Sequence, residues 1–248
     1  GAAPALADVW TVPSAQTPTL QFALEAPTSP VADGDTIELT DAGFYLSAYT
    51  VSTPNLTIRA AAGQSITIDA LGLDSVFTVM ADNLTLQDLT ITGGSAPDDG
   101  GAIYVPSGHD ATVIDCVLTD NECLADDGGA VHVNTGSVLT MTGCTLTNNR
   151  TLGVSTPNGG AIYAFEATVF LDDCVFIGNV SADSGGAAFF NDAVVDITNC
   201  HFEGNSAQAG GALRFAGGAR GTVADCLIYD NDSDSTGGGV DSKLSLIH

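Results

Sequence analysis

Apolar and polar residues alternate in short runs along most of this chain, and the runs recur with the same internal spacing. Five segments align on a cysteine: ATVIDCVLTDN, LTMTGCTLTNN, VFLDDCVFIGN, VDITNCHFEGN and GTVADCLIYDN. In each segment, one apolar residue lies three positions before the cysteine and another lies two positions after it. Because successive side chains of a strand point to opposite faces, this spacing predicts a strand, a polar corner and a second strand.

Each of these segments is followed by a variable loop and then by a Gly-Gly pair that leads into another alternating run. The pairs begin at positions 100, 128, 159, 185, 210 and 237, so the repeat is 25 to 31 residues long. This length suits one coil of a parallel β-solenoid, whereas a propeller blade needs four strands and about 40 or more residues. The pattern therefore predicts an all-β parallel β-helix with three-strand coils.

The two ends of the chain depart from the repeat. The run TPTLQFALEA places Leu20, Phe22 and Leu24 where a short helix would cover the open end of the first coil. We therefore expect an N-terminal segment and cap over residues 1–34 and the β-helix over residues 35–248. At the other end, GGGVDSK starts a further coil but LSLIH leaves the register, as expected of a chain truncated at its C-terminus.

The repeat also resembles known families. GGAI alternating with FIGN (176–179) and FEGN (202–205) resembles the repeats of chlamydial polymorphic outer-membrane proteins and of secreted right-handed parallel β-helix proteins. The opening GDTIEL…GFY resembles the first turn of pectate-lyase-like β-helices. The resemblance implies right-handed coils, a secreted or cell-surface location and a role in adhesion. Ala5-Leu6-Ala7, just before Asp8, is similar to the small-residue end of a secretory signal.

The strand after each Gly-Gly pair carries two columns of side chains. The first column is apolar and is expected to face the core: Ile103, Val131, Ile162, Ala188, Leu213 and Val240. The residues that follow are expected to face outward: Tyr104, His132, Tyr163, Phe189 and Arg214. This outward column has two interpretations. It is either side-chain stacking along the sheet or a stripe that binds a glycan or a partner surface.

Two further columns are expected inside the coils. The periodic cysteines, 116, 144, 174, 200 and 226, are expected to be small buried hydrophobic residues, because a single file of thiols does not converge on a metal. An Asn lies five residues after each, and its repetition predicts an internal hydrogen-bond ladder. Cys123 lies outside the register and is expected to be a spare thiol in a loop.

The loops before the Gly-Gly pairs are acidic. Asp98 and Asp99 occupy positions equivalent to those of Asp126 and Asp127 one coil later. The loop DNDSDSTGG adds alternating carboxylates at Asp230, Asp232 and Asp234. Loops rich in carboxylate oxygens suit calcium, which is the cofactor that this pattern predicts. The alternative is a set of solvated acidic turns.

Charge and hydropathy exclude some classes of partner. The 248 residues contain 5 Lys and Arg against 30 Asp and Glu, a formal net charge of −25. Nucleic acid binding needs clustered cations, so it is not expected. No apolar run approaches the roughly 20 residues of a membrane-spanning helix, so this chain is not expected to insert into a membrane.

Together these patterns favour a non-catalytic extracellular or cell-surface module for adhesion or for binding a polysaccharide or host glycan. One alternative is a self-associating structural protein, such as a filament or surface-layer component. Another is a calcium-dependent polysaccharide lyase or a glycoside hydrolase. Catalysis is less favoured because Arg214 and His132 are about three coils apart, roughly 14 Å, which is too far for one centre. The sequence also contains no recognisable catalytic motif of pectate lyases or polygalacturonases.

Overall fold

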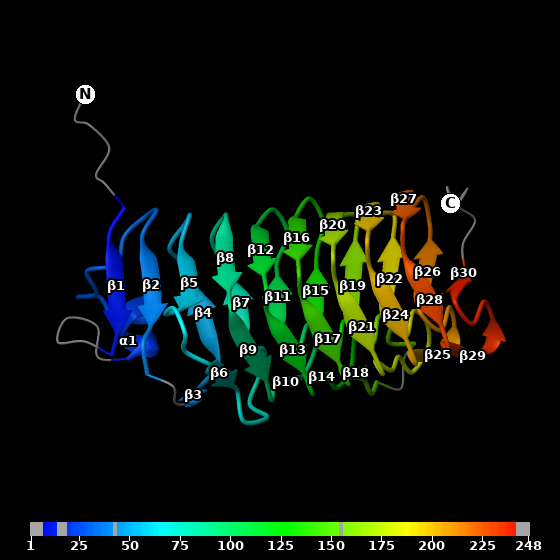
Figure 1. The fold of residues 1–248 in the computed structure, drawn as a ribbon, viewed down its shortest axis with the longest axis horizontal. Helices are drawn as coiled ribbons and strands as arrows, with labels where there is room; N and C mark the ends of the chain where they lie inside the picture. The colour runs from blue at the N-terminus through cyan, green and yellow to red at the C-terminus, as the bar shows by residue number, and fades with distance from the viewer. Residues whose placement is uncertain (1–6, 14–18, 42–43, 154–155, 242–248) are drawn as a thin grey trace.

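The computed structural model describes residues 7–13, 19–41, 44–153 and 156–241. These residues form one elongated solenoid in which strands of successive coils lie side by side along the long axis (Figure 1). The parallel β-solenoid predicted from the repeat is therefore confirmed. Ala5 and Leu6 of the signal-like stretch, and the C-terminal LSLIH, lie outside the described residues.

Three long sheets run along the solenoid, and neighbouring strands within each pair in parallel. Sheet A comprises β1 (Val9–Val12), β2 (Thr36–Leu39), β5 (Thr57–Ala60), β8 (Leu84–Gln87), β12 (Asp110–Ile114), β16 (Val138–Thr142), β20 (Thr168–Asp172), β23 (Val194–Thr198) and β27 (Arg220–Ala224). Sheet B comprises β3 (Phe44–Leu46), β6 (Ile66–Asp69), β9 (Leu89–Thr92), β13 (Val117–Thr119), β17 (Thr145–Thr147), β21 (Val175–Ile177), β24 (His201–Glu203) and β28 (Leu227–Tyr229). Sheet C comprises β4 (Tyr49–Val51), β7 (Phe77–Val79), β11 (Ile103–Val105), β15 (Val131–Val133), β19 (Ile162–Phe165), β22 (Ala188–Asn191), β26 (Leu213–Ala216) and β30 (Val240–Asp241).

Several coils contain a fourth, short strand that the repeat did not predict. These strands are β10 (Ser95–Ala96), β14 (Glu122–Cys123), β18 (Arg150–Thr151), β25 (Ser206–Ala209) and β29 (Asp232–Thr236). They form because the chain stays extended for a few residues beyond the Asn corner before the variable loop begins. Cys123 is consequently buried in β14, where its Sγ donates to the Asp98 carbonyl oxygen at 2.9 Å, and is not a thiol in an exposed loop.

The periodic cysteines face the interior, as predicted. Four of them are buried and Cys226 is half-buried, and all are free thiols. The corner between sheets A and B is made by the residue before each cysteine, which adopts a left-handed conformation, as at Asp115 (φ 50°) and Asp173 (φ 52°). Burial raises the pKa of the Cys116 thiol to about 12, which suits packing better than redox chemistry.

The Asn column forms the predicted hydrogen-bond ladder. The backbone N–H and the Nδ2 of Asn149 both donate to Asn179 Oδ1 at 3.0 Å. Asn179 repeats the pattern one coil later by donating to Asn205 Oδ1, and its Nδ2 also donates to the Leu146 carbonyl oxygen at 2.9 Å. The left-handed corner residue is the one before each ladder Asn, for example Asn148 (φ 55°), so the Asn side chains themselves point inward.

The Gly-Gly pairs have two separate steric causes. The first glycine is left-handed, as in Gly159 (φ 68°), which residues other than glycine adopt only with strain. The second glycine lies against the next coil. A Cβ on Gly160 would come within 2.6 Å of the Val180 carbonyl carbon and would overlap the Gly186 carbonyl oxygen. Each pair therefore sets both a turn and the close stacking of two coils.

A short helix covers one end of the core, as the apolar run predicted. It is α1 (Leu20–Glu25), and Thr19 Oγ1 caps it by accepting from the Phe22 N–H at 3.0 Å. Leu20 and Leu24 join the hydrophobic core. Sheet A begins earlier than the expected boundary at residue 35, because β1 pairs in register with β2 and extends the sheet into the N-terminal segment.

Candidate functional site

The predicted binding stripe lies on the outer face of sheet C. Its members are in register from one coil to the next: Tyr104, His132, Tyr163, Phe189 and Arg214. His132, Tyr163 and Phe189 are only 5%, 9% and 8% exposed, although none of the three belongs to the main hydrophobic cluster inside the coils. These three side chains are therefore largely covered, and the binding-stripe interpretation of the column stays a prediction.

The rings of this column stack along the solenoid. Ring centroids are separated by 5.7 Å for Tyr104 and His132, 4.9 Å for His132 and Tyr163, and 5.6 Å for Tyr163 and Phe189. The last two rings are nearly parallel. These spacings are those of stabilising aromatic pairs, so the geometry supports the stacking interpretation of the column.

Acidic loop residues face the same column. His132 Nδ1 lies 2.8 Å from Asp99 Oδ1 of an acidic loop, whereas Arg214 forms an ion pair with Asp241, its in-register neighbour on strand β30. Asp127 is buried, and its Oδ1 accepts from the Asn158 N–H at 2.6 Å. Two carboxylates that the sequence offered as calcium ligands thus take part in contacts within the protein. The acidic loops and the aromatic column, predicted as separate features, form one packed layer.

The remaining predicted calcium ligands are more open. Asp98, Asp126, Asp230, Asp232 and Asp234 are all exposed. Among the residues that the structure describes, no group of three or more His, Cys, Asp or Glu side chains is placed to hold a metal ion. Calcium binding therefore stays a prediction from the sequence pattern.

The carboxyl group of Asp127 gives the protein a defined pH dependence. Burial raises its pKa from 3.8 to about 6, against the opposing hydrogen bonds from Asn158. Since the folded-state pKa is the higher one, folding takes up a proton, and the free energy of unfolding falls as pH rises from about 4 to 6. Asp127→Asn should remove this fall and make the variant more stable than the wild type above pH 6, by about 2–3 kcal/mol. Denaturant unfolding across this pH range tests the prediction, and parallel curves would contradict it.

Burial of the column also predicts the effect of removing one of its rings. Phe189→Ala should lower the free energy of unfolding by about 3 kcal/mol, because it removes a buried ring that stacks on Tyr163 and leaves a cavity. The matched control is Phe170→Ala on sheet A, where the ring is 44% exposed and its removal should cost less than about 1 kcal/mol. Equal losses in the two variants would show that Phe189 is not covered in solution.

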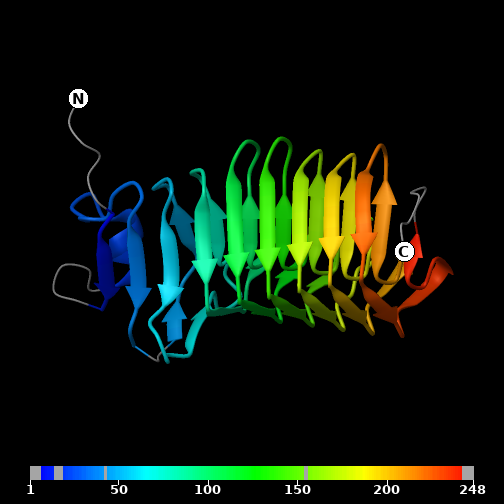
Figure 2. The ribbon, with the colours of Figure 1, turned by 45° about the horizontal axis from the view of Figure 1, so that its top comes forward.

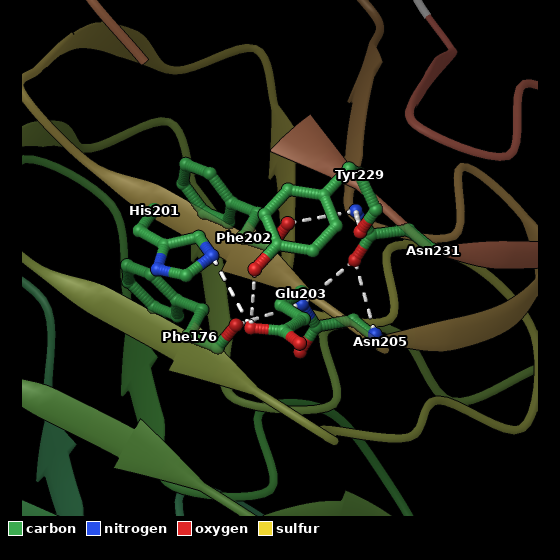
Figure 3. A network of polar contacts seen from close by, with 7 residues as sticks. All are labelled: Phe176, His201, Phe202, Glu203, Asn205, Tyr229 and Asn231. Carbon is green, nitrogen blue, oxygen red and sulfur yellow. Dashed lines mark hydrogen bonds and ion pairs between the residues drawn. The ribbon is translucent and has the colours of Figure 1, made fainter. Parts of the chain in front are cut away.

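A polar network stands on the outer face of sheet B (Figure 3). Tyr229 Oη donates to Glu203 Oε2 at 2.7 Å, and His201 Nε2 lies 3.4 Å from the same oxygen. The His201 and Tyr229 rings stack with centroids 5.2 Å apart. The bond to Glu203 raises the pKa of the Tyr229 phenol. Phe176 and Phe202 lie beneath this network in the core, stacked at 4.8 Å.

A hollow with an exposed aromatic ring lies on the outer face of sheet A. Its volume is about 220 Å³, and it spans β16, β20 and β23. Its lining residues are Thr140, Met141, Thr142, Phe170, Leu171, Asp172, Asp196 and Thr198. The strands of sheet A lie side by side here, with the turns from sheet C along one edge (Figure 2). The hollow therefore combines an accessible apolar ring with hydroxyl and carboxylate groups.

The two carboxylates of this hollow are held by the next coil. Asp172 Oδ1 accepts from Thr198 Oγ1 at 2.9 Å and from Asn199 Nδ2 at 2.8 Å. These two donors hold the pKa of the Asp172 carboxyl below its usual value. Asp196 Oδ1 accepts from Thr222 Oγ1 in the same manner.

The sequence analysis did not identify the sheet A hollow or the sheet B network. The sequence signal for both sites was present in the outward-facing positions of the strands before and after each periodic cysteine. In sheet A, the outward positions Thr112 and Thr140 give way to Phe170 and Asp196 in the same register. Phe170 and Asp196 therefore interrupt a column of threonines. An interruption of this kind indicates that the residue is not needed for the repeat itself and is a candidate for a separate role.

Comparison with known proteins agrees with this architecture. Residues 129–243 match the family model described as the right handed beta helix region. The fold is a right-handed parallel β-helix. The matched segment covers somewhat less than half of the β-helix chain and includes the Phe170 hollow.

One solved structure also matches the β-helix. It is an alginate lyase from Paenibacillus sp. str. FPU-7, aligned over 95% of this chain and 99% of that chain with 14% sequence identity. The TM-score is 0.28, and a likeness this remote carries no argument about function. No curated protein matches the chain. The resemblance to the chlamydial repeats and the secreted or cell-surface location stay predictions.

Among the described residues, no helix is long and apolar enough to span a membrane.

Proposed function

We propose that this protein is a non-catalytic extracellular or cell-surface module that binds a glycan at the Phe170 hollow. The observation that carries the proposal is the 44% exposed Phe170 ring in a hollow lined by hydroxyls and carboxylates. A sugar ring has an apolar face that stacks on an aromatic ring, and its hydroxyls need oriented hydrogen-bond partners. The hollow offers both kinds of contact on a rigid sheet.

The chemistry of the hollow favours binding over bond cleavage. A glycoside hydrolase needs one protonated carboxyl as a general acid, with a raised pKa. The Asp172 carboxyl is instead held ionised by its two donors. A lyase needs positive charge near the developing anion, and no Lys or Arg lines the hollow. The rigid carboxylates suit the recognition of a ligand.

An array of neutral, amino and acidic glycans, probed with the purified protein, tests the proposal. The wild type should bind at least one class, and Phe170→Ala should weaken that binding by about tenfold or more. Leu73→Ala is the matched control, since Leu73 is 67% exposed and does not line the hollow. Absence of binding to every glycan, or equal binding by Phe170→Ala, would overturn the proposal.

A further inference from the structure

The ionisable groups that line the sheet A hollow are both acidic. Asp172 and Asp196 contribute carboxylates, and the other polar lining groups are threonine hydroxyls. The cations Arg59, Arg150 and Arg214 pair with carboxylates elsewhere on the solenoid, and Arg220, at the start of β27 beside Val194, does not line the hollow. An anionic glycan would therefore meet only like charge in the hollow, whereas a positively charged ligand would find uncompensated partners.

Each carboxylate of the hollow is held in a fixed orientation by its neighbours. The next coil engages Oδ1 of Asp172 through Thr198 and Asn199, and Oδ1 of Asp196 through Thr222. The backbone N–H of Asp173 also acts on the Asp172 carboxyl. These bonds fix the side chains in place, so little conformational freedom would be lost when a ligand binds the two carboxylates.

Phe170 lies beside both carboxylates. Asp196 is its in-register neighbour on β23, roughly 4.8 Å away between Cα atoms, and Asp172 lies two residues along β20, roughly 6.7 Å away. An ammonium group has three donors for the two carboxylates, and an aromatic face attracts a cation through its quadrupole. The exposed ring is an observation independent of the carboxylates, and it too fits a cationic sugar.

We infer that the glycan bound at the Phe170 hollow is cationic, a polymer or oligomer of sugars with free, protonated amino groups. This inference rests on the proposed glycan-binding function and names its ligand class. The net charge of −25 acts in the same direction, because it attracts cationic chains and repels acidic polysaccharides. Binding of such a ligand should weaken as ionic strength rises.

The test compares a short glucosamine oligomer with its fully N-acetylated counterpart and with a uronic acid oligomer, by titration calorimetry. The glucosamine oligomer should bind about tenfold or more tightly than the acetylated one, and this preference should disappear when Asp172→Asn and Asp196→Asn are combined. The control combines Asp88→Asn with Asp120→Asn, which removes the same charge from exposed positions outside the hollow and should keep the preference. Thermal melting checks that both double variants are folded.

The outcomes separate this inference from the proposed function. Equal affinity for the amino and acetylated oligomers, or a preference for the uronic acid oligomer, would overturn the inference and leave glycan binding in place. A preference that the Asp88 and Asp120 control also loses would assign the effect to overall charge and overturn the site. Lack of binding to all three oligomers, together with a silent glycan array, would overturn the proposed function itself.

Discussion

Asn179→Ala should lower the free energy of unfolding by about 3–5 kcal/mol and is expected to have one of the two largest effects in the chain. Its side chain accepts two bonds from Asn149 and donates to Leu146 O and to Asn205 Oδ1. Alanine leaves these groups buried without partners, and each costs about 1–3 kcal/mol. Chemical denaturation of the variant measures the loss.

A substitution that removes a single exposed amide gives the control for this prediction. Gln208→Ala removes one bond to the Ala182 carbonyl oxygen at a solvent-exposed position, so its effect should stay within about 0.5 kcal/mol. Similar effects of Asn179→Ala and Gln208→Ala would mean that the ladder does not stabilise the coils.

Gly186→Ala is expected to be at least as damaging, since it acts on the backbone spacing of two coils. A Cβ there would overlap the Gly211 carbonyl oxygen and would lie 2.6 Å from the Ser206 N. Both are backbone atoms, and Ser206 N donates to the Asn179 carbonyl oxygen, so a shift would disturb the backbone bonds between coils. We expect a loss of more than about 4 kcal/mol or failure to fold, seen as a lowered melting temperature or aggregation.

Gly204→Ala separates this close approach from the conformational freedom of glycine. Gly204 is left-handed (φ 62°), but a Cβ there would have no atom within 4 Å. Its substitution should therefore cost only the strain of a left-handed alanine, about 1–2 kcal/mol. If Gly204→Ala were as harmful as Gly186→Ala, contact between coils would not be the reason for the second glycine of each pair.

The parts of the fold that repeat were predictable from the sequence. The column of Cys116 and Cys144 and the ladder of Asn149 and Asn179 follow from alternation and a fixed spacing, because stacked coils place equivalent residues in the same surroundings. Alternation also placed Tyr163 on the outer face of sheet C. What a periodic sequence determines is the direction of a side chain relative to the sheet.

Exposure of that outer face was not predictable, because it depends on the variable loops. Asp127 and Asn158 lie in such loops, and the bonds between them depend on loop paths that no repeat fixes. The same holds for the Phe170 hollow, where Asp172 and Asp196 are oriented by bonds to the following coil. The register alone does not determine which side chains of neighbouring coils bond to each other.

The affinity of the best glycan from the array for a series at position 170 tests the central claim most directly. Titrations with Phe170→Trp, Phe170→Leu and Phe170→Ala compare an aromatic, an aliphatic and a truncated side chain at one exposed position. The account predicts wild-type or tighter binding for Trp, and a loss of about tenfold or more for both Leu and Ala. Binding that is unchanged across the whole series would contradict a glycan site built on Phe170.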